Sequence, residues 1–290
     1  MDRASIPLIS VGIPTYNRPD GLRRTLSCLS QQTYSHLEII VSDNCSPGTG
    51  TADVIAQMAT QDPRIVYIRQ DAQLGAAGNF RFVLRKAKGE FFMWAADDDE
   101  WKPTFVERCY NALKDGAASA MTGFEISYRA DGTKEPGLMP ALDRSQSTAS
   151  NIHAFLSRLT PSLFYGLHRR SLIGFILNDE FFDYYDCYFI LRLIANGGIA
   201  LVPERLYVAG IDAPEYVVKT ATQSWGSSLQ YLPFYRATRR LIADANLGFF
   251  ERLKLEAKLA ALVTKISLVN ESRAFIRGLK REEVKNPDAK

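Results

Sequence analysis

Residues 91–99 read Phe-Phe-Met-Trp-Ala-Ala-Asp-Asp-Asp, and this stretch decides the fold. The four large apolar residues from Phe91 to Trp94 are typical of a β-strand. Three adjacent carboxylates follow, and charges packed this closely raise one another's pKa. A divalent cation relieves the conflict, and hard oxygen ligands suit Mg²⁺ or Mn²⁺. The stretch therefore predicts a metal site at a strand end or, alternatively, a solvated acidic turn before the helix near Pro103.

Short β-rich runs and helical runs alternate on the N-terminal side of this stretch. Strands are predicted at 9–13, 37–41 and 65–68, helices at 20–32 and 51–60, and a loop that runs into a helix at 75–88. Such alternation indicates parallel βαβ units in a doubly wound sheet, whose ligands bind beyond the carboxyl ends of the strands. Pro14-Thr15-Tyr16, Asp43 and Asp97-Asp98-Asp99 all follow predicted strands. We expect these three segments to border one crevice, where Asp43 either accepts hydrogen bonds from a nucleobase or ribose or forms an Asx-turn.

The pattern is less regular after Pro103. Helices are predicted at 105–114 and 188–195, strands at 117–128, 163–169 and 199–203, and a long loop at 129–150. From about residue 228 onward the chain is predicted to be helical, because Gly and Pro are few until the polar end.

Four ordered blocks of the sequence resemble the family 2 glycosyltransferases, which have the GT-A fold. The blocks are Val11–Arg18, Ser30–Tyr34 followed by Leu37–Asn44, the segment with Gly75, Asn79 and 87–91, and the aspartates that follow it. The resemblance covers about residues 9–207 and implies a Rossmann-like α/β/α sandwich with a mostly parallel central sheet. It divides residues 1–227 into a nucleotide-sugar half (1–103) and an acceptor half (104–227), with a helical basic extension at 228–290.

The resemblance also implies a donor site. Pro14, Thr15, Tyr16 and Asp43 would line the nucleotide, with Asp43 near the base and Asp97 near the ribose or diphosphate.

The acidic cluster would correspond to the DXD motif of the family. Counted back from Pro103, a common landmark of the family, the motif begins at Ala96 and ends at Asp98. Asp98 is thus the predicted ligand of Mn²⁺ or Mg²⁺, with Asp99 in support, and a register of Asp97 and Asp99 around Asp98 is the alternative.

The segment 185–193 resembles the acidic pair of the family, which usually reads Glu-Asp. Here it reads Tyr185-Asp186, so only the second carboxylate, the one usually assigned as the base, is present. Asp186 is the predicted general base of an inverting transfer, with Asp183 as the alternative. A helix N-cap is the structural interpretation of Asp186.

Three histidines occur, and none follows His168, so the C-terminal histidine ligand of some relatives is missing. His168 lies in the acceptor half of the resemblance, and we expect a polar strand-end residue rather than a contact to acceptor or diphosphate.

The net charge of +3 is too small to indicate a nucleic-acid partner. Residues 236–290 carry thirteen Lys or Arg and seven Asp or Glu, a balance of +6, which leaves −3 for the remainder. A basic amphipathic helix in this tail fits either peripheral contact with an anionic membrane or packing on the catalytic domain or a second subunit, as in a homodimer. Four scattered cysteines, no signal peptide and no apolar run long enough to span a bilayer predict a cytoplasmic protein.

The predicted function is metal-dependent transfer of a sugar from a nucleotide-diphosphate donor to a saccharide or lipid-linked acceptor, in polysaccharide biosynthesis. Tyr185 and Ala96 depart from the family pattern and leave open a catalytically inactive nucleotide-sugar-binding subunit. A sugar-phosphate nucleotidyltransferase is a further alternative, although Pro14-Thr15-Tyr16-Asn17 supplies no glycine-rich phosphate loop.

Overall fold

The computed structural model describes residues 6–128, 131–211 and 231–285, with side chains as far as Leu268. Its nucleotide half contains β1 (Ile9–Thr15), α1 (Pro19–Ser30), β2 (Leu37–Asp43), α2 (Gly50–Ala59), β3 (Ile65–Arg69), α3 (Gly75–Lys86) and β4 (Phe91–Trp94). Then come β5 (Glu100–Trp101), α4 (Phe105–Leu113), β6 (Ser119–Tyr128), β7 (Lys134–Pro136), α5 (Thr148–Ser157), η1 (Pro161–Tyr165), β8 (Leu167–Arg169), α6 (Arg170–Ile173), η2 (Gly174–Leu177), α7 (Tyr185–Ala195) and β9 (Ile199–Ile211). Helices α9 (Leu232–Asp244) and α10 (Phe249–Lys285) end the chain.

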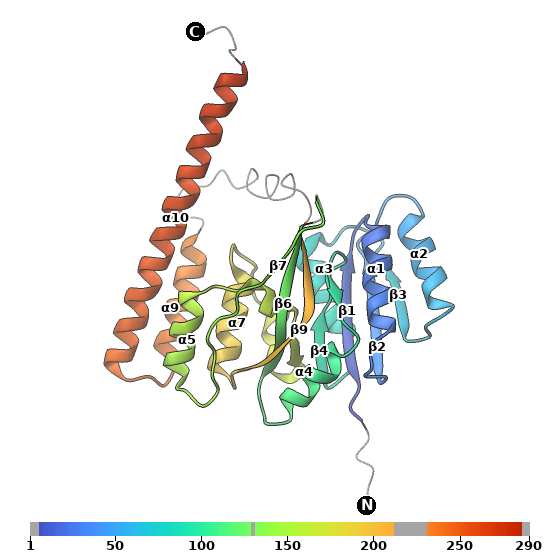
Figure 1. Ribbon diagram of the computed structural model, residues 1–290, viewed down its shortest axis with the longest axis horizontal. Coiled ribbons are helices and arrows are strands. Elements are labelled where there is room, and N and C mark those ends of the chain that lie inside the picture. Colours follow the sequence, from blue (N-terminus) through green and yellow to red (C-terminus); the bar gives the residue numbers. More distant parts are fainter. Residues whose placement is uncertain (1–5, 129–130, 212–230, 286–290) are drawn as a thin grey trace, which may run out of the picture.

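One central sheet joins the described strands in the order β3-β2-β1-β4-β8-β6-β9-β5, and β7 pairs with β6 (Figure 1). The longest ladders of paired residues are parallel. They join β3 to β2, β2 to β1, β1 to β4 and β6 to β9. The antiparallel pairings, which involve β5, β7 and β8, each join only two or three residue pairs. The sheet is therefore mostly parallel, and the predicted α/β architecture is confirmed.

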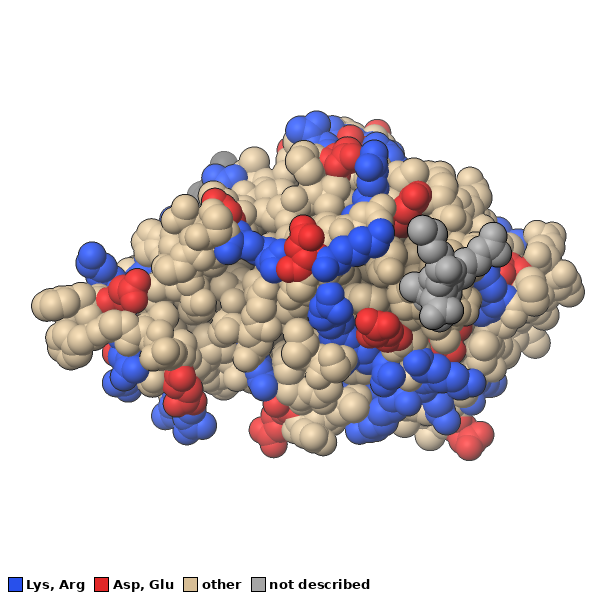
Figure 2. All heavy atoms as spheres, turned by 90° about the horizontal axis from the view of Figure 1, so that it is seen from below, with Lys and Arg blue, Asp and Glu red and all other residues tan. Residues whose placement is uncertain are grey.

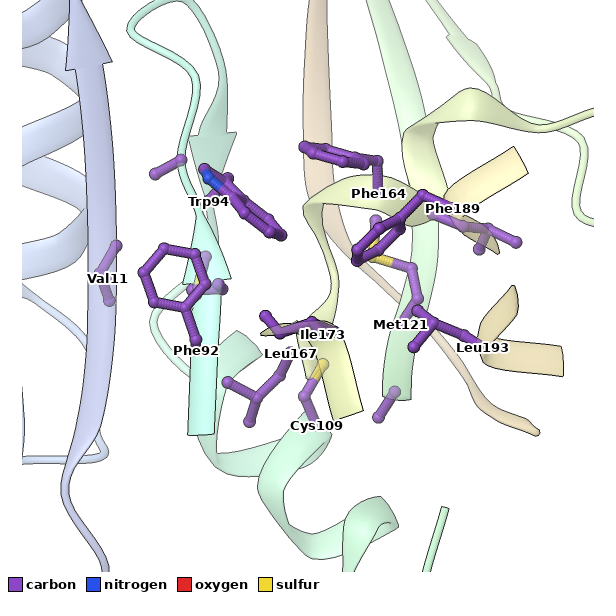
Figure 3. Close-up of a cluster of buried hydrophobic side chains, with 14 of the residues drawn as sticks. Val11, Phe92, Trp94, Cys109, Met121, Phe164, Leu167, Ile173, Phe189 and Leu193 are labelled. Carbon is purple, nitrogen blue, oxygen red and sulfur yellow. The ribbon is translucent and has the colours of Figure 1, made fainter. Parts of the chain in front are cut away.

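Helices cover both faces of the sheet, because side chains alternate across each strand. On one face, Trp94 of β4 stacks on Phe164 with ring centroids 4.6 Å apart and packs edge-on against Phe189 of α7 (Figure 3). The Trp94 indole N–H donates to the carbonyl of Phe80 in α3, 3.0 Å away. On the other face, Phe91 packs against Tyr110 of α4. The strand that precedes the three aspartates is thus covered by side chains on both faces.

The second half differs from the sequence prediction in several places, and strand β9, for example, continues to Ile211, beyond the predicted 199–203. Residues 161–165 form a 3₁₀ helix, and only Leu167–Arg169 is a strand. Pro161 has a fixed φ suited to a helix start, and Gly166 lies so close to strand β6 that a Cβ would meet the Ala120 carbonyl oxygen at 2.6 Å. The predicted long loop at 129–150 contains β7 and the beginning of α5.

The C-terminal helices pack beside the sheet domain. Helix α9 contacts α7, and α10 contacts α5 and α9. The expected domain boundary at 227–228 lies outside the described residues. None of the described helices is both long and apolar enough to cross a membrane, and all four cysteines are free thiols.

Candidate functional site

Three strand ends meet at one edge of the sheet. Thr15, the last residue of β1, is paired with Asp43, the last residue of β2. The chain after β4 continues along β1, where the Ala95 amide donates to the Gly12 carbonyl at 2.9 Å. Pro14 is paired with Ser42 within the same ladder. The structure therefore brings together the three segments that the topology predicted to be neighbours.

The acidic turn after β4 is linked to the loop after β1 by a hydrogen bond and two ion pairs. The Thr15 hydroxyl donates to Asp97 Oδ2 at 2.7 Å. Arg18 Nη1 lies 2.7 Å from Asp98 Oδ2 and 3.5 Å from Asp97 Oδ1. A guanidinium thus places positive charge between two adjacent carboxylates. No sequence pattern assigns a role to Arg18, and only its position four residues after Pro14 places it near the turn.

Asp97 and Asp99 point in different directions. Burial is the main cause that raises the pKa of Asp97 to about 6, against the opposing effects of the Thr15 hydroxyl and the Arg18 charge. Asp99 accepts hydrogen bonds from the Tyr207 hydroxyl and from the Gly210 amide, both in β9. Its own burial, followed by the charge of Asp98, raises the pKa of Asp99 to about 8. Asp97 and Asp98 therefore face the β1 loop, whereas Asp99 fastens the turn to β9.

Helix α1 packs against the acidic turn through Thr25 and Gly21. The buried Thr25 hydroxyl lies 3.1 Å from the carbonyl oxygens of both Ala96 and Asp99. Gly21 allows a close approach, because a Cβ there would meet the Asp97 carbonyl oxygen at 2.1 Å. Sequence patterns gave no signal for either contact, since both depend on how α1 docks against a turn far away in the chain.

Asp43 is fully buried and is held by three groups. Its Oδ1 accepts the Ser46 amide at 2.8 Å, and its Oδ2 accepts from the Tyr67 hydroxyl and from Arg69, both at 3.1 Å. The bond to Ser46 reaches the amide three residues on, one residue further than in an Asx-turn. Asp43 orients Arg69, whose side chain is 43% exposed at the rim of the crevice.

Tyr16 directly follows β1 and lies at the same edge of the sheet. It is 44% exposed, and its hydroxyl accepts a hydrogen bond from the Gln73 amide group at 2.8 Å. Asn17 and Cys45, in the loops after β1 and β2, both adopt positive φ angles. Strained backbone at non-glycine residues is concentrated at functional sites, and here it occurs on two neighbouring loops of the crevice.

Asp186 lies in the first turn of α7 and is half-buried. The N-cap of this helix is Tyr184, with a φ of 67°, so Asp186 is not the capping residue. Its Oδ1 accepts the Cys187 amide at 2.7 Å, while burial raises the pKa of its carboxyl group. Asp186 is one helical turn before Phe189, which packs against Trp94. Helix α7 is thereby held against β4, the strand that leads into the acidic turn.

Tyr185 occupies the position where the family has a second carboxylate. Its hydroxyl donates to Asp179 Oδ2 at 2.8 Å, and Arg192 Nη1 lies 3.0 Å from the same oxygen. Asp183, the alternative base, is exposed. The structure thus distinguishes a sheltered carboxyl group, Asp186, from a solvated one.

His168 is buried in the core. Its Nε2–H donates to the Phe164 carbonyl at 2.9 Å, so Nδ1 accepts the Ser119 hydroxyl at 2.8 Å. Burial lowers the pKa of His168 to about 4. His168 is therefore a neutral residue of the core in the middle of β8, rather than the expected strand-end residue.

In the part of the chain that the structure describes, no three His, Cys, Asp or Glu side chains form a cluster that could hold a metal by themselves. Asp97 and Asp98 are the two carboxylates of the acidic turn that face Arg18. One or two carboxylates are what Mg²⁺ uses when substrate phosphates and water complete its ligands. The donor set therefore fits a metal that binds together with a diphosphate.

The family model described as glycosyl transferase family 2 matches residues 10–193. The putative teichuronic acid biosynthesis glycosyltransferase TuaG of Bacillus subtilis is 31% identical over 128 residues, which are 44% of this chain and 50% of that protein. The GalNAc(5)-diNAcBac-PP-undecaprenol beta-1,3-glucosyltransferase of Campylobacter jejuni is 38% identical over 96 residues, 33% of this chain and 31% of that protein. The chain thus spans half or less of the length of these curated relatives.

Solved structures share the fold. S. aureus TarS 1-349 in complex with UDP-GlcNAc matches with a TM-score of 0.68 and 18% identity, over 90% of this chain and 74% of that one. The mannosyltransferase PcManGT from Pyrobaculum calidifontis, in complex with GDP-Man and Mn²⁺, matches with a TM-score of 0.52 and 16% identity, over 99% and 83% of the two chains.

Proposed function

Because the chain belongs to glycosyl transferase family 2, we propose that it is a metal-dependent, inverting glycosyltransferase that uses a nucleotide-diphosphate sugar. The acceptor is a saccharide or a lipid-linked sugar, and the product belongs to a surface polysaccharide or glycolipid. The observation that carries the proposal is the acidic turn at the end of β4, which meets Thr15 and Arg18 at the carboxyl edge of a parallel sheet. Two relatives with glycosyltransferase names and neighbours bound to UDP-GlcNAc and GDP-Man support it.

The donor nucleotide would bind across the three strand ends. Pro14, Thr15 and Tyr16 at the end of β1 would line it on one side, and Asp43 with its partner Arg69 would line it on the other. Asp97, held by Thr15, would contact the ribose or diphosphate. Asp98 would be the direct ligand of Mn²⁺ or Mg²⁺, and Asp99 would support it by anchoring the turn to Tyr207.

The bound metal would offset the negative charge that develops on the leaving diphosphate. Asp186 would take the proton of the acceptor hydroxyl as that oxygen attacks the anomeric carbon. The bond from the anomeric carbon to the diphosphate breaks as the new glycosidic bond forms, so the nucleoside diphosphate leaves from the opposite face. A carboxyl group whose pKa is raised by burial is a stronger base than a solvated one, and this favours Asp186 over Asp183.

The first test measures nucleotide binding by the shift that each nucleotide causes in the melting temperature of the protein. UDP, GDP and dTDP would each be added with Mn²⁺, with Mg²⁺ and with EDTA. We expect one nucleotide to raise the melting temperature only with metal, and Asp98→Ala to abolish that shift. The proposal fails if none of the three nucleotides shifts the melting temperature under any condition.

A second test separates an active enzyme from a binding subunit. Donor hydrolysis or transfer would be followed in the wild type and in Asp186→Asn, with nucleotide binding measured on the same samples. Activity that is lost in the variant while binding is retained supports the catalytic assignment. A wild-type chain that binds nucleotide and turns over no donor, with any of a panel of saccharide and lipid-linked acceptors, would indicate the inactive subunit instead.

A further inference from the structure

A cavity of about 480 Å³ lies between the start of α5, the end of α7 and the turn that joins α9 to α10. A volume of this size is typical of small-molecule sites. Helix α7 packs against both α5 and α9, so the walls of the cavity belong to helices that hold one another in place. Polar groups on such elements are positioned more precisely than polar groups on loops.

The lining of this cavity is rich in polar side chains. They are those of Thr148, Tyr188, Arg192, Asn196, Asp244 and Asn246. Within the described part of the chain, no hydrogen bond or ion pair forms to the side chains of Thr148, Asp244 or Asn246. These three side chains therefore face the cavity with their hydrogen-bonding groups unused by the protein.

Arg192 and Asn196 also keep part of their hydrogen-bonding capacity for a ligand. Arg192 uses Nη1 for Asp179 Oδ2, 3.0 Å away, and its guanidinium carbon stacks 3.5 Å above the centre of the Phe175 ring. Its Nε and Nη2 bind no acceptor among the described residues. Asn196 Nδ2 donates to the Arg192 carbonyl at 2.7 Å, which leaves the amide oxygen for a donor in the cavity.

These groups combine hydrogen-bond donors and acceptors. The guanidinium of Arg192 only donates, the carboxylate of Asp244 only accepts, and the hydroxyl and amide groups do both. Each hydroxyl group of a sugar also donates and accepts, so a sugar can satisfy a mixed set of this kind. An ionised carboxylate or phosphate only accepts hydrogen bonds and would face Asp244 without a partner for it.

The charges at the cavity favour a neutral ligand. Its lining contains one cation, Arg192, and one anion, Asp244, and Arg192 is already paired with Asp179. Figure 2 shows the molecule from the side on which the parallel strands begin, and at its left end, which carries α9 and α10, Lys or Arg and Asp or Glu side chains are interspersed. The cavity therefore has no surplus of positive charge that would hold an anion.

Tyr188 adds an aromatic ring to the lining. Its ring packs against that of Phe182, with centroids 5.6 Å apart. Burial raises the pKa of its hydroxyl group, and the charges of Arg192, Asp179 and Asp244 all act on that pKa, so the hydroxyl lies near the charged groups of the cavity. An aromatic side chain with a hydroxyl tip offers apolar surface to the C–H groups of a sugar and a polar group to its hydroxyls.

The cavity is separate from the proposed donor crevice. Asn196 directly follows α7, ten residues after Asp186, which corresponds to about 15 Å along a helix. Strand β9 begins shortly afterwards at Ile199 and runs parallel to β6, so this end of α7 lies where the parallel strands begin (Figure 1). The acidic turn lies at the opposite edge of the sheet, where those strands end.

We propose that this cavity is a second carbohydrate site, which binds a neutral saccharide unit away from the proposed catalytic centre. Asn196, Asp244 and Asn246, all exposed, form its rim and would hydrogen-bond the sugar hydroxyls. The half-buried Thr148 and Arg192 would bind hydroxyls that reach further in. Neither nucleotide nor metal is needed for this binding, so it does not depend on the proposed function.

Binding is tested by saturation-transfer NMR on the full chain without nucleotide or metal. The probes are methyl β-glucoside, methyl β-galactoside, N-acetylglucosamine, cellobiose and lactose. We expect at least one of them to bind with a dissociation constant on the order of 1 to 10 mM. Glucuronate, the acidic counterpart of glucose, should bind more weakly than the neutral sugars. An excess of UDP, GDP and dTDP with Mn²⁺, which would fill the proposed donor site, should leave the sugar signal unchanged.

Two variants locate the bound sugar. Asn196→Ala combined with Asp244→Ala removes two rim groups and should weaken binding about tenfold or more. Ala195→Phe places a large side chain in the cavity, which Ala195 lines, and should abolish binding. The matched control is Asn111→Ala combined with Asp115→Ala, two exposed residues outside the cavity, and it should bind as the wild type does. The melting temperature of each variant shows whether it is folded.

Three results would overturn the proposal. They are a wild-type chain that binds none of the five neutral probes, a sugar signal that nucleotide displaces, and a signal that persists in the folded rim and Ala195→Phe variants. Tighter binding of glucuronate than of the neutral sugars would overturn the assignment of a neutral ligand. Since none of these measurements uses transfer activity, their failure is distinct from failure of the proposed enzyme.

Discussion

Gly21 in α1 lies directly against the carbonyl oxygen of Asp97, so close that a Cβ atom at position 21 would meet that oxygen at 2.1 Å. The contact involves backbone on the acidic side, which cannot rotate away as a flexible side chain would. The helix and the acidic turn are therefore positioned relative to each other by the absence of a single methyl group.

Gly21→Ala is expected to displace the acidic turn. The overpacking should lower the free energy of unfolding by about 1 to 3 kcal/mol and reduce the nucleotide-induced thermal shift. Chemical denaturation measures the first effect and thermal shift the second. Gly50→Ala is the control, because its Cβ would have 3.7 Å to the nearest atom; it should leave nucleotide binding unchanged. Wild-type stability and binding in Gly21→Ala would show that the turn is free to adjust.

Arg18→Gln should alter the response of the protein to metal. The guanidinium lies where a divalent cation would place its charge. Its removal therefore increases the repulsion between the carboxylates of Asp97 and Asp98. We expect the free energy of unfolding in EDTA to fall by about 1 kcal/mol and the stabilisation by Mn²⁺ without nucleotide to increase. Arg23→Gln, which removes an exposed contact to Gln57, should change neither value. A Mn²⁺ titration that overlays that of the wild type would contradict competition between Arg18 and the metal.

His168 should make stability depend on pH on the acidic side. Its pKa is lowered by burial to about 4 in the folded chain, whereas an unfolded histidine has a pKa of about 6.5. Between these values the unfolded chain binds more protons than the folded chain, so stability falls as the pH falls from about 6.5 to 4. The loss is on the order of 3 kcal/mol at most.

The measurement is the free energy of unfolding against pH for the wild type and for His168→Gln. Glutamine keeps an N–H donor for the Phe164 carbonyl and does not titrate. We expect the variant to be less stable at neutral pH and to lose less stability on acidification. Parallel curves for the two proteins would show that His168 does not supply the pH dependence.

Asp186→Asn should abolish transfer without abolishing donor binding. Removing a general base typically lowers the rate about 10²- to 10⁴-fold, and the amide fits the same space. Asp183→Asn, three residues earlier and exposed, is the matched control and should retain most of the activity. The roles are reversed if Asp183→Asn is the variant that loses the rate.

Much of the first half of the fold follows from local sequence. The apolar run at 91–94 and the turn after Asp43 mark strands and their ends, because each acts through neighbours in the chain, whereas β1 continues through Pro14 to Thr15. The 3₁₀ helix at 161–165 and the strand β7 could not be predicted in the same way. Gly166 and Gly137 are needed there for contacts with Ala120 and Phe124, which are distant in sequence.

The sequence by itself determined the alternating strands and helices of the first half and that Thr15, Asp43 and the three aspartates lie at strand ends, because periodicity and turn residues are local properties. Only the tertiary structure decided where each carboxylate points: Asp97 and Asp98 toward Arg18, and Asp99 toward Tyr207, 108 residues further along the chain. Three adjacent residues of one type carry no local signal that separates their roles. Their environments differ because the folded chain brings a different partner and a different degree of burial to each one.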